Sequence, residues 1–310
     1  MKKSSNRYNR QTKMAESQSP RVLSVQSHVV SGYVGNKSAT FPLQLLGFEV
    51  DAINSVQFCN HTGYKAVTGQ VLTEKDLDDL AKGLEENGLD FYSHLLTGYI
   101  GAESFLQRVC SLVKHLKTVN PKLTYVCDPV MGDNGKMYVP KELLPVYKNS
   151  VLPLADIITP NQFEVELLTD IKINSVDDAW KAIDVLHSKG CPIVVLSSTE
   201  LGTEQSLLAI ASKKVGSNSE KVTIKIPKLP ASFTGTGDLF AALLLAWMHK
   251  TNSQLKVSLE RTVSSLQAVL KRTLEDSKGE RTSKAMELKL IQSKSDIESP
   301  KIVVSAESVF

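Results

Sequence analysis

The chain has 310 residues, 42% of them hydrophobic and 22% charged, and its formal net charge is +3 at pH 7. These values are typical of an ordinary globular protein, and they exclude a general attraction to nucleic acid or to a membrane surface. The longest apolar run is also shorter than the roughly 20 residues that a membrane-spanning helix needs.

The small basic excess is confined to residues 1–20, which hold five basic residues and one acid. This segment has no apolar stretch, so we expect a flexible basic N-terminal tail rather than a signal peptide. The chain has four cysteines and no C-x-x-C pair, so the cysteines are expected to be reduced and buried in a cytoplasmic protein. Residues 21–310 are expected to form a single domain.

Strand-like and helix-like segments alternate in the first half of the chain, with glycines at several boundaries. Strands are predicted from short apolar or alternating runs, and helices from apolar residues at helical spacing. Thr73, followed by acids in the first turn, is the predicted cap of one helix. The predicted elements are strands at 21–27, 47–53 and 93–99 and helices at 36–46, 73–86 and 104–118.

The second half continues the alternation. An apolar strand at 123–127 runs into Asp128, and Pro129 blocks its continuation. Another strand leads to Thr159, which we predict to be a helix cap with Pro160 at the first helical position. The remaining predicted elements are a buried strand at 191–198, a β-like stretch at 222–226 and helices at 235–249 and 255–274.

This order of elements predicts an α/β fold with a largely parallel sheet that is covered on both faces. In such sheets, ligands bind beyond the carboxyl ends of the strands. Several polar residues fall just after candidate strands and are expected to converge on one rim of the sheet: Ser27, Asp128, Thr159, Ser197 and, through its loop, Asp238.

The most informative stretch is Phe233–Asp238, which leads straight into an apolar run that ends at Trp247. Its two glycines permit a tight turn and close approach of a ligand, and the amino end of the following helix favours a phosphate. The stretch lacks the lysine of a Walker A loop. Asp238 is explained equally well as a helix N-cap and as a general base beside a transferring phosphoryl group.

Other polar residues also have a purely structural explanation. His28 and His61 lack the spaced partners of a zinc site. Asp128 can be a turn residue at a strand end, and Asn161 and Glu164 can be first-turn residues that complement a helix dipole. The joint occurrence of these features in this order is much harder to explain by structure alone.

Seven segments carry a family resemblance: Gln26–Val29 with Gly32–Asn36, Ser55–Phe58, Asn60–Tyr64, Leu96–Tyr99, Cys127–Val130, Ile158–Glu164 and Gly235–Asp238. Together they resemble the animal-type pyridoxal kinases of the ribokinase-like superfamily, over about residues 21–310. The resemblance implies a three-layer α/β/α sandwich with a mainly parallel central sheet, and a homodimer. It also implies ATP-dependent phosphorylation of the 5′-hydroxyl of pyridoxal, and of pyridoxine and pyridoxamine, which carry the same hydroxymethyl group.

The resemblance implies that Asp238 is the base that accepts the proton of the pyridoxal hydroxyl. Gly235, Thr236 and Gly237 would form an anion hole for the transferring phosphate. Ser27 would hydrogen-bond the pyridine ring, and Thr62 would contact its polar substituents. The implied pocket wall mixes apolar and aromatic side chains, which suit a flat ring: Val34, Val56, Phe58, His61 and Tyr99.

The same resemblance implies Mg²⁺ with ATP, and a monovalent cation, K⁺ or Na⁺. Asp128, Asn161 and Glu164 would position Mg-ATP, with Asp128 and Glu164 reaching the magnesium through water. Asp133, Thr159 and Ser197 would surround the monovalent cation, although Ser197 stands where the family has threonine. The implied nucleotide contacts are completed by Ser197, Ser198, Phe233, Thr236 and Gly237.

Two other functions are compatible with the sequence. A kinase of the same fold that acts on hydroxymethylpyrimidine or a sugar would share Asp238 and the anion hole, and would differ in pocket residues such as Ser27 and Thr62. A non-catalytic vitamin- or nucleotide-binding protein would bind ligands without turnover, although the residues for the base and the anion hole are present here. A panel of substrates separates these functions.

Overall fold

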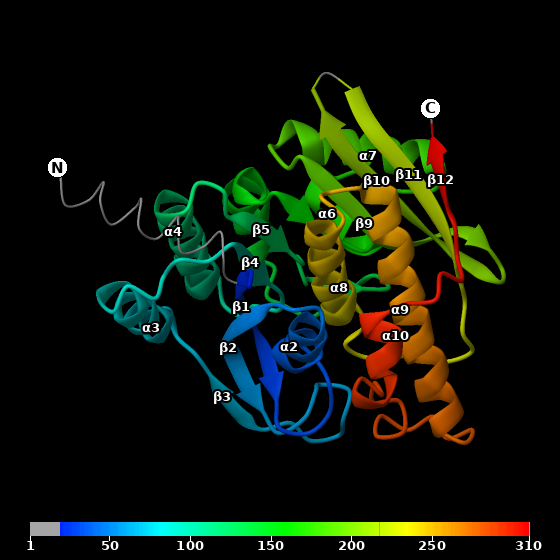
Figure 1. Cartoon of the computed structure of the whole chain (residues 1–310), viewed down its shortest axis with the longest axis horizontal. Coiled ribbons are helices and arrows are strands. Elements are labelled where there is room, and N and C mark those ends of the chain that lie inside the picture. Colours follow the sequence, from blue (N-terminus) through cyan, green and yellow to red (C-terminus); the bar gives the residue numbers. More distant parts are fainter. Residues whose placement is uncertain (1–18, 217, 310) are drawn as a thin grey trace.

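The computed structural model describes residues 19–216 and 218–309 (Figure 1). Most of the expected basic tail therefore lies outside the described residues. Ten strands of the described chain form one sheet in the order β12-β11-β10-β9-β8-β5-β4-β1-β2-β3, and β6 and β7 form a small separate hairpin. The strands are β1 (Arg21–Val29), β2 (Glu49–Phe58), β3 (Gly69–Val71), β4 (His94–Thr97), β5 (Thr124–Cys127), β6 (Gly132–Asp133), β7 (Lys136–Met137), β8 (Ile157–Ile158), β9 (Ile193–Thr203), β10 (Ser206–Val215), β11 (Asn218–Pro227) and β12 (Ala306–Val309).

The centre of the sheet is parallel, as predicted. β1 pairs in parallel with β2 and β4, and parallel pairing continues through β5, β8 and β9. Antiparallel strands extend the sheet on both sides, with β3 beside β2 and with β10, β11 and β12 beyond β9. Because the central strands are parallel, their carboxyl ends lie at one edge of the sheet.

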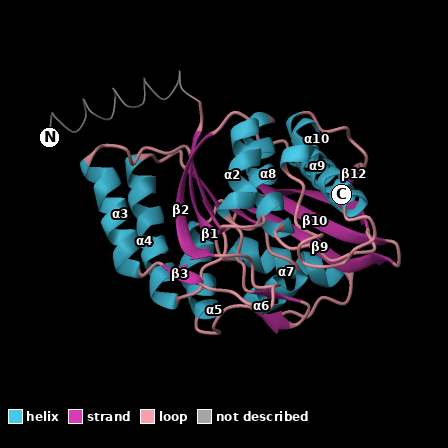
Figure 2. Ribbon diagram, turned by 90° about the horizontal axis from the view of Figure 1, so that it is seen from below, coloured by secondary structure: helices cyan, strands magenta, loops and turns pink. Residues whose placement is uncertain are grey.

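Helices cover both faces of the sheet and complete a three-layer α/β/α sandwich (Figure 2). Side chains of the central strands alternate between two apolar cores, so Val22 faces α2, α8 and α9 whereas Leu23 faces the core formed with α3 to α7. The helices are α2 (Asn36–Leu45), α3 (Glu74–Glu86), α4 (Glu103–Val119), α5 (Leu143–Val146), η1 (Tyr147–Val151), η2 (Leu152–Leu154), α6 (Gln162–Thr169), α7 (Val176–Ser188), α8 (Thr236–Lys250), α9 (Leu255–Asp276), η3 (Ile291–Ser293) and α10 (Lys294–Glu298).

Helix α8 is apolar on every side. All residues of Leu239–Met248 are buried, as the absence of a polar face predicted. The helix lies between the sheet and its neighbours α2 and α9 (Figure 1). Burial on all sides fixes the position of its amino end.

Several elements were missing from the prediction, chiefly β10, α7, α10 and β12. β10 contains alanines and lysines, which are poor strand formers, and it is a strand because β9 and β11 both pair with it. The four cysteines form no disulfide, and the expected burial is wrong only for Cys59, which is half-buried. Among the described residues, no helix is both long and apolar enough to cross a membrane.

Candidate active site

The amino end of α8 begins at a turn that only glycine can make. Gly235 has a φ of +84°, and a Cβ at this position would lie 2.2 Å from the carbonyl oxygen of Tyr33. No side chain caps this end of the helix. Since the first amide groups of a helix have no partner within it, the amides around Gly235, Thr236 and Gly237 are suited to bind an anion.

Asp238 lies in the first turn of α8 and is not its cap. The N-cap is Gly235, so the interpretation of Asp238 as an N-cap is wrong: a cap precedes the helix, and Asp238 is already inside it. Its side chain is half-buried. Burial raises the pKa of Asp238, and a hydrogen bond from the backbone amide of Gly35 opposes this rise.

The amino end of α2 faces the same space. Its N-cap is Gly35, which has a φ of +53°, and a Cβ there would lie 2.0 Å from the carbonyl oxygen of Ser27. The Ser38 hydroxyl, in the first turn of α2, donates to the carbonyl oxygen of Gly235 at 3.2 Å. Two partially positive helix ends therefore meet beside the Asp238 carboxylate.

A buried acidic group lies next to this meeting point. Asp128 follows β5, is 5% exposed, and lies 3.4 Å from where a Cβ of Gly237 would be. The Thr159 hydroxyl, which follows β8, donates to it at 3.2 Å. Burial raises the pKa of Asp128 well above its usual range, and the negative charges of Glu164 and Asp238 raise it further.

Glu164 owes its position to a capping box. The Asn161 side chain accepts from the Glu164 amide, and Glu164 accepts from the Asn161 amide, both at 2.9 Å. The prediction that Thr159 caps this helix with Pro160 at its first position is therefore wrong, because the Thr159 hydroxyl binds Asp128 instead. Glu164 also accepts the Met131 amide at 2.9 Å, and burial raises its pKa to about 7.

The residues predicted to hold a pyridine ring lie at the carboxyl ends of β1, β2 and β4. Register pairs Val29 with Phe58, and the Ser55 hydroxyl donates to the carbonyl oxygen of Tyr99 at 2.8 Å. Ser27, Val34, Val56 and His61 are buried, Phe58 and Tyr99 are half-buried and Thr62 is exposed. The structure thus brings this set to the edge of the sheet beside which the amino end of α8, with Asp238, lies.

A cleft of about 340 Å³ opens beside the amino end of α6, where Asn161 and Gln162 line it. Three of the predicted nucleotide and cation residues line it, namely Asp133, Asn161 and Ser198. Phe233 and Ser197 do not: Phe233 packs against the core around α8, and the Ser197 hydroxyl donates to the carbonyl oxygen of Pro160 at 3.3 Å. The cleft also has lining residues that were not predicted, among them Phe163, Glu166, Lys172, Glu200 and Leu207.

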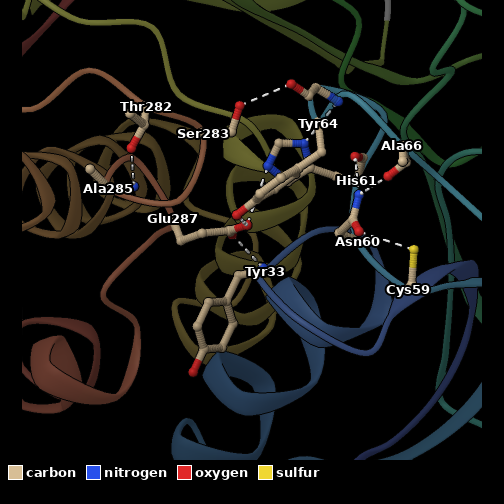
Figure 3. A network of polar contacts seen from close by, with 11 residues as sticks. Tyr33, Cys59, Asn60, His61, Tyr64, Ala66, Thr282, Ser283, Ala285 and Glu287 are labelled. Atoms are coloured by element: carbon tan, nitrogen blue, oxygen red, sulfur yellow. Dashed lines mark hydrogen bonds and ion pairs between the residues drawn. The ribbon is translucent and has the colours of Figure 1, made fainter.

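In the described part of the chain, no group of three or more His, Cys, Asp or Glu side chains is arranged to hold an ion. The side chain of Asp133 accepts hydrogen bonds from Asn134, and Thr159 is buried. A site residue missed from the sequence is Glu287, which contacts His61 and Tyr64 from near the other end of the chain (Figure 3).

The chain is similar to known proteins over nearly its whole length. The sequence model of the family described as phosphomethylpyrimidine kinase matches residues 51–283. Pyridoxal kinase of Arabidopsis thaliana is 54% identical over 290 residues, covering 93% of this chain and 94% of the relative. Human pyridoxal kinase is 52% identical over 304 residues, covering 92% of this chain and 97% of the relative.

The fold is also found among solved structures. Pyridoxal kinase from Leishmania donovani in complex with ADP and pyridoxamine has a TM-score of 0.89 at 33% identity, covering 94% of this chain and 99% of that one. A complex of the same enzyme with ADP and pyridoxine has a TM-score of 0.88 at 34% identity, with the same coverage. The predicted sandwich and the predicted resemblance are both confirmed. This chain belongs to the pyridoxal kinase family.

Proposed function

We propose that this protein transfers the γ-phosphoryl group of ATP to the 5′-hydroxyl of pyridoxal, giving pyridoxal 5′-phosphate, and acts in the same way on pyridoxine and pyridoxamine. The observation that carries the proposal is the position of Asp238, where the amino ends of α2 and α8 meet. The Leishmania donovani structures, which hold ADP with pyridoxamine or pyridoxine, support the choice of substrates.

Asp238 would be the general base that orients and deprotonates the hydroxyl. Burial raises the pKa of Asp238 and so makes its carboxylate a stronger base, while the Gly35 amide keeps the ionised form accessible. Because both groups lie on rigid helix ends, the carboxylate would be held in position before substrate binds.

Gly235, Thr236 and Gly237 would supply backbone donors to the transferring phosphate. These amides belong to the N-cap and first turn of α8, which is buried from Leu239 to Met248. Donors that are fixed in advance at the place where charge develops usually make the largest contribution to catalysis. The glycine at 235 is needed because the Tyr33 carbonyl leaves no room for a side chain.

The pyridine ring would lie beside Ser27 and Thr62, with Val34, Val56, Phe58, His61 and Tyr99 as its walls. Their common position at the ends of β1, β2 and β4 supports this assignment. ATP would extend from Asp238 toward the cleft lined by Asn161 and Ser198. Ser197 and Phe233 would then border the nucleotide only indirectly.

Asp128 and Glu164 fit a magnesium site. Both are buried carboxylates. Burial raises the pKa of Asp128, repulsion from Glu164 and Asp238 raises it further, and a cation would oppose both effects. Magnesium prefers oxygen ligands and keeps some of its waters, so these contacts can run through water. Bound with ATP, the ion neutralises charge on the phosphates.

Asp133, Thr159 and Ser197 are the proposed ligands of a monovalent cation. All three offer oxygen atoms, the type of donor that alkali cations take. Thr159 and Ser197 make hydrogen bonds within the protein, to Asp128 and to Pro160, that would have to coexist with the ion. Turnover measured in K⁺, Na⁺ and a bulky organic cation tests this site.

The test of the function is phosphate transfer from Mg-ATP to pyridoxal by purified protein, followed by pyridoxal phosphate absorbance. Asp238→Asn and Asp238→Ala should lower the rate roughly 10²–10⁴-fold while nucleotide binding stays close to that of the wild type. Asp177→Asn is the matched control, because Asp177 is an exposed acid in the first turn of α7. Near-normal turnover of the Asp238 variants would refute the assignment of the base.

A second candidate is favoured by the family match over residues 51–283, whose description names phosphomethylpyrimidine kinase. Hydroxymethylpyrimidine is therefore the parallel substrate in the same assay. Preference for it would keep the fold and Asp238 and overturn the proposed substrate. Ligand binding without turnover of either substrate would support a non-catalytic binding protein. We also propose a homodimer in the cytoplasm, which light scattering and cell fractionation test.

A further inference from the structure

A segment near the carboxyl end of the chain lies beside the loop that precedes and follows Thr62: its Ser283 and Glu287 lie next to His61 and Tyr64 of the loop (Figure 3). The Ser283 hydroxyl donates to the carbonyl oxygen of Gly63 at 2.9 Å, although the two residues are 220 positions apart. Glu287 reaches the same loop and meets His61 and Tyr64. These contacts come from a connection after α9 that the proposed chemistry does not use.

The Glu287 carboxylate gathers three donors. Its Oε2 accepts the Tyr33 amide at 2.9 Å, and its Oε1 accepts the Tyr64 hydroxyl at 3.1 Å and lies 3.3 Å from His61 Nε2. Its side chain is only 13% exposed, and that of His61 is 5% exposed. Although burial raises the pKa of Glu287, the bonds from His61, Tyr33 and Tyr64 lower it below its usual value, so the group is ionised.

His61 connects Glu287 to the backbone on both sides of Thr62. Its Nδ1 accepts the Gly63 amide at 3.1 Å, so the ring proton lies on Nε2, which faces Glu287. The residue before Thr62 is thus bonded to Glu287, and the residue after it is bonded to the His61 ring and to Ser283. The Thr62 side chain is left exposed on a backbone that is held on both sides.

The same carboxylate is joined to the turn beside the amino ends of α2 and α8. Gly32 has a φ of +92°, and a Cβ there would lie 2.2 Å from Glu287 Oε1, so the Glu287 side chain fills the space that another residue at 32 would need. Tyr33, whose amide Glu287 accepts, has its carbonyl against Gly235. One side chain therefore connects the Thr62 loop with the turn that leads to the anion-binding end of α8.

We propose that Glu287 is a positioning residue for the pyridine ring: it fixes the loop Asn60–Thr68, and through His61 the orientation of Thr62, relative to the amino ends of α2 and α8. This inference rests on the proposed function, because Thr62 and His61 are taken as contacts of pyridoxal. Since these contacts form in the ground state and persist in the transition state, their loss should raise KM with little change in kcat.

The test compares Glu287→Gln with Glu280→Gln, an exposed glutamate of the same connection. In Glu287→Gln one acceptor oxygen becomes a donor, so KM for pyridoxal should rise about tenfold, as expected for one lost charge-assisted hydrogen bond, while KM for ATP stays within about twofold. Tyr64→Phe removes one donor only and should raise KM for pyridoxal about threefold. Glu280→Gln should behave as the wild type.

Hydrogen exchange of residues 59–68 in the ligand-free protein gives a second measurement that does not need turnover. Faster exchange in this loop, with the exchange of α8 unchanged, is expected for Glu287→Gln and supports the inference. Equal changes in both KM values, or unchanged exchange in the loop, would overturn it. If Glu287→Gln does not fold, Tyr64→Phe provides the same comparison.

The two proposals fail in different ways. If the wild type does not phosphorylate pyridoxal, the proposed function is wrong, and the exchange of residues 59–68 alone decides whether Glu287 holds the loop. If the wild type is active and KM for pyridoxal is unaffected in both variants, the function stands and the positioning role of Glu287 is wrong.

Discussion

Glu164→Gln is expected to change how the free energy of unfolding depends on pH. The change measures the cost of ionising the buried Glu164 carboxyl group. Glu164 is 3% exposed, and burial raises its pKa from the ordinary 4.5 to about 7. The folded protein therefore binds this proton more tightly than the unfolded chain does. Consequently the free energy of unfolding contributed by Glu164 falls as pH rises from about 4.5 to about 7.

The size follows from that difference in pKa. One pH unit corresponds to about 1.4 kcal/mol, so ionised Glu164 costs the ligand-free protein about 3 kcal/mol above pH 7. In the glutamine variant this cost is absent at every pH. The variant pays a separate, pH-independent penalty of about 1–3 kcal/mol, because its amide group must face one of the backbone amides that Glu164 accepts from Met131 and Asn161.

Urea unfolding of ligand-free protein, followed by tryptophan fluorescence between pH 4.5 and 8, measures the effect. The free-energy difference between variant and wild type should move by about 3 kcal/mol in favour of the variant across this range. Glu166→Gln is the control on the same helix. Burial raises the pKa of Glu166, but Lys172 and the Ile173 amide lower it below its usual value. The free-energy difference between this variant and the wild type should therefore shift in favour of the wild type as pH rises. A pH-independent difference for Glu164→Gln would refute the reasoning.

Three further changes test other parts of the structure. Burial, helped by the charge of His249, lowers the pKa of His94 to about 3. The free energy of unfolding should therefore fall by about 1.4 kcal/mol per pH unit below pH 6.5, and His94→Phe should abolish this loss in urea titrations. An unchanged dependence of the unfolding free energy on pH in the variant would contradict the prediction. Gly235→Ala should lower kcat/KM more than about tenfold, whereas Gly47→Ala, with a φ of +90° and open space around it, should cost only about 1 kcal/mol in thermal unfolding and leave kcat/KM intact. Equal effects of the two would argue against the anion hole. Leu243→Ala, in the buried centre of α8, should lower the free energy of unfolding by about 2–5 kcal/mol. A loss under about 1 kcal/mol would contradict the close packing of α8.

Features set by short stretches of sequence were predicted well. Thr73 forms the expected capping box with Asp76, and the apolar run after Gly235 is a buried helix. In each case the deciding residues lie within one or two helical turns. The same holds for Asp128: Pro129 predicted that the strand would stop there, and β5 ends at Cys127.

Features set by distant partners were not predicted. From the local sequence, Thr159 and Asn161 can both cap α6. In the structure Asn161 is the cap, and the Thr159 hydroxyl donates to Asp128, which follows the neighbouring strand β5. β10 is a strand only because β9 and β11 lie beside it. Glu287 has no local signal at all, since its partners Tyr64 and Tyr33 precede it by 223 and 254 residues.

The distance in sequence between the two helix ends has a consequence for synthesis of the protein. Ser38 and Gly235, which bond across the site, are 197 positions apart, and α8 covers the apolar face of the strands that precede it. At about 5–20 residues per second, the ribosome takes roughly 10–40 s to make the intervening chain. During that interval α2 covers only part of this apolar face of the nascent sheet, so chaperone binding should be greatest before α8 emerges and should fall once it docks.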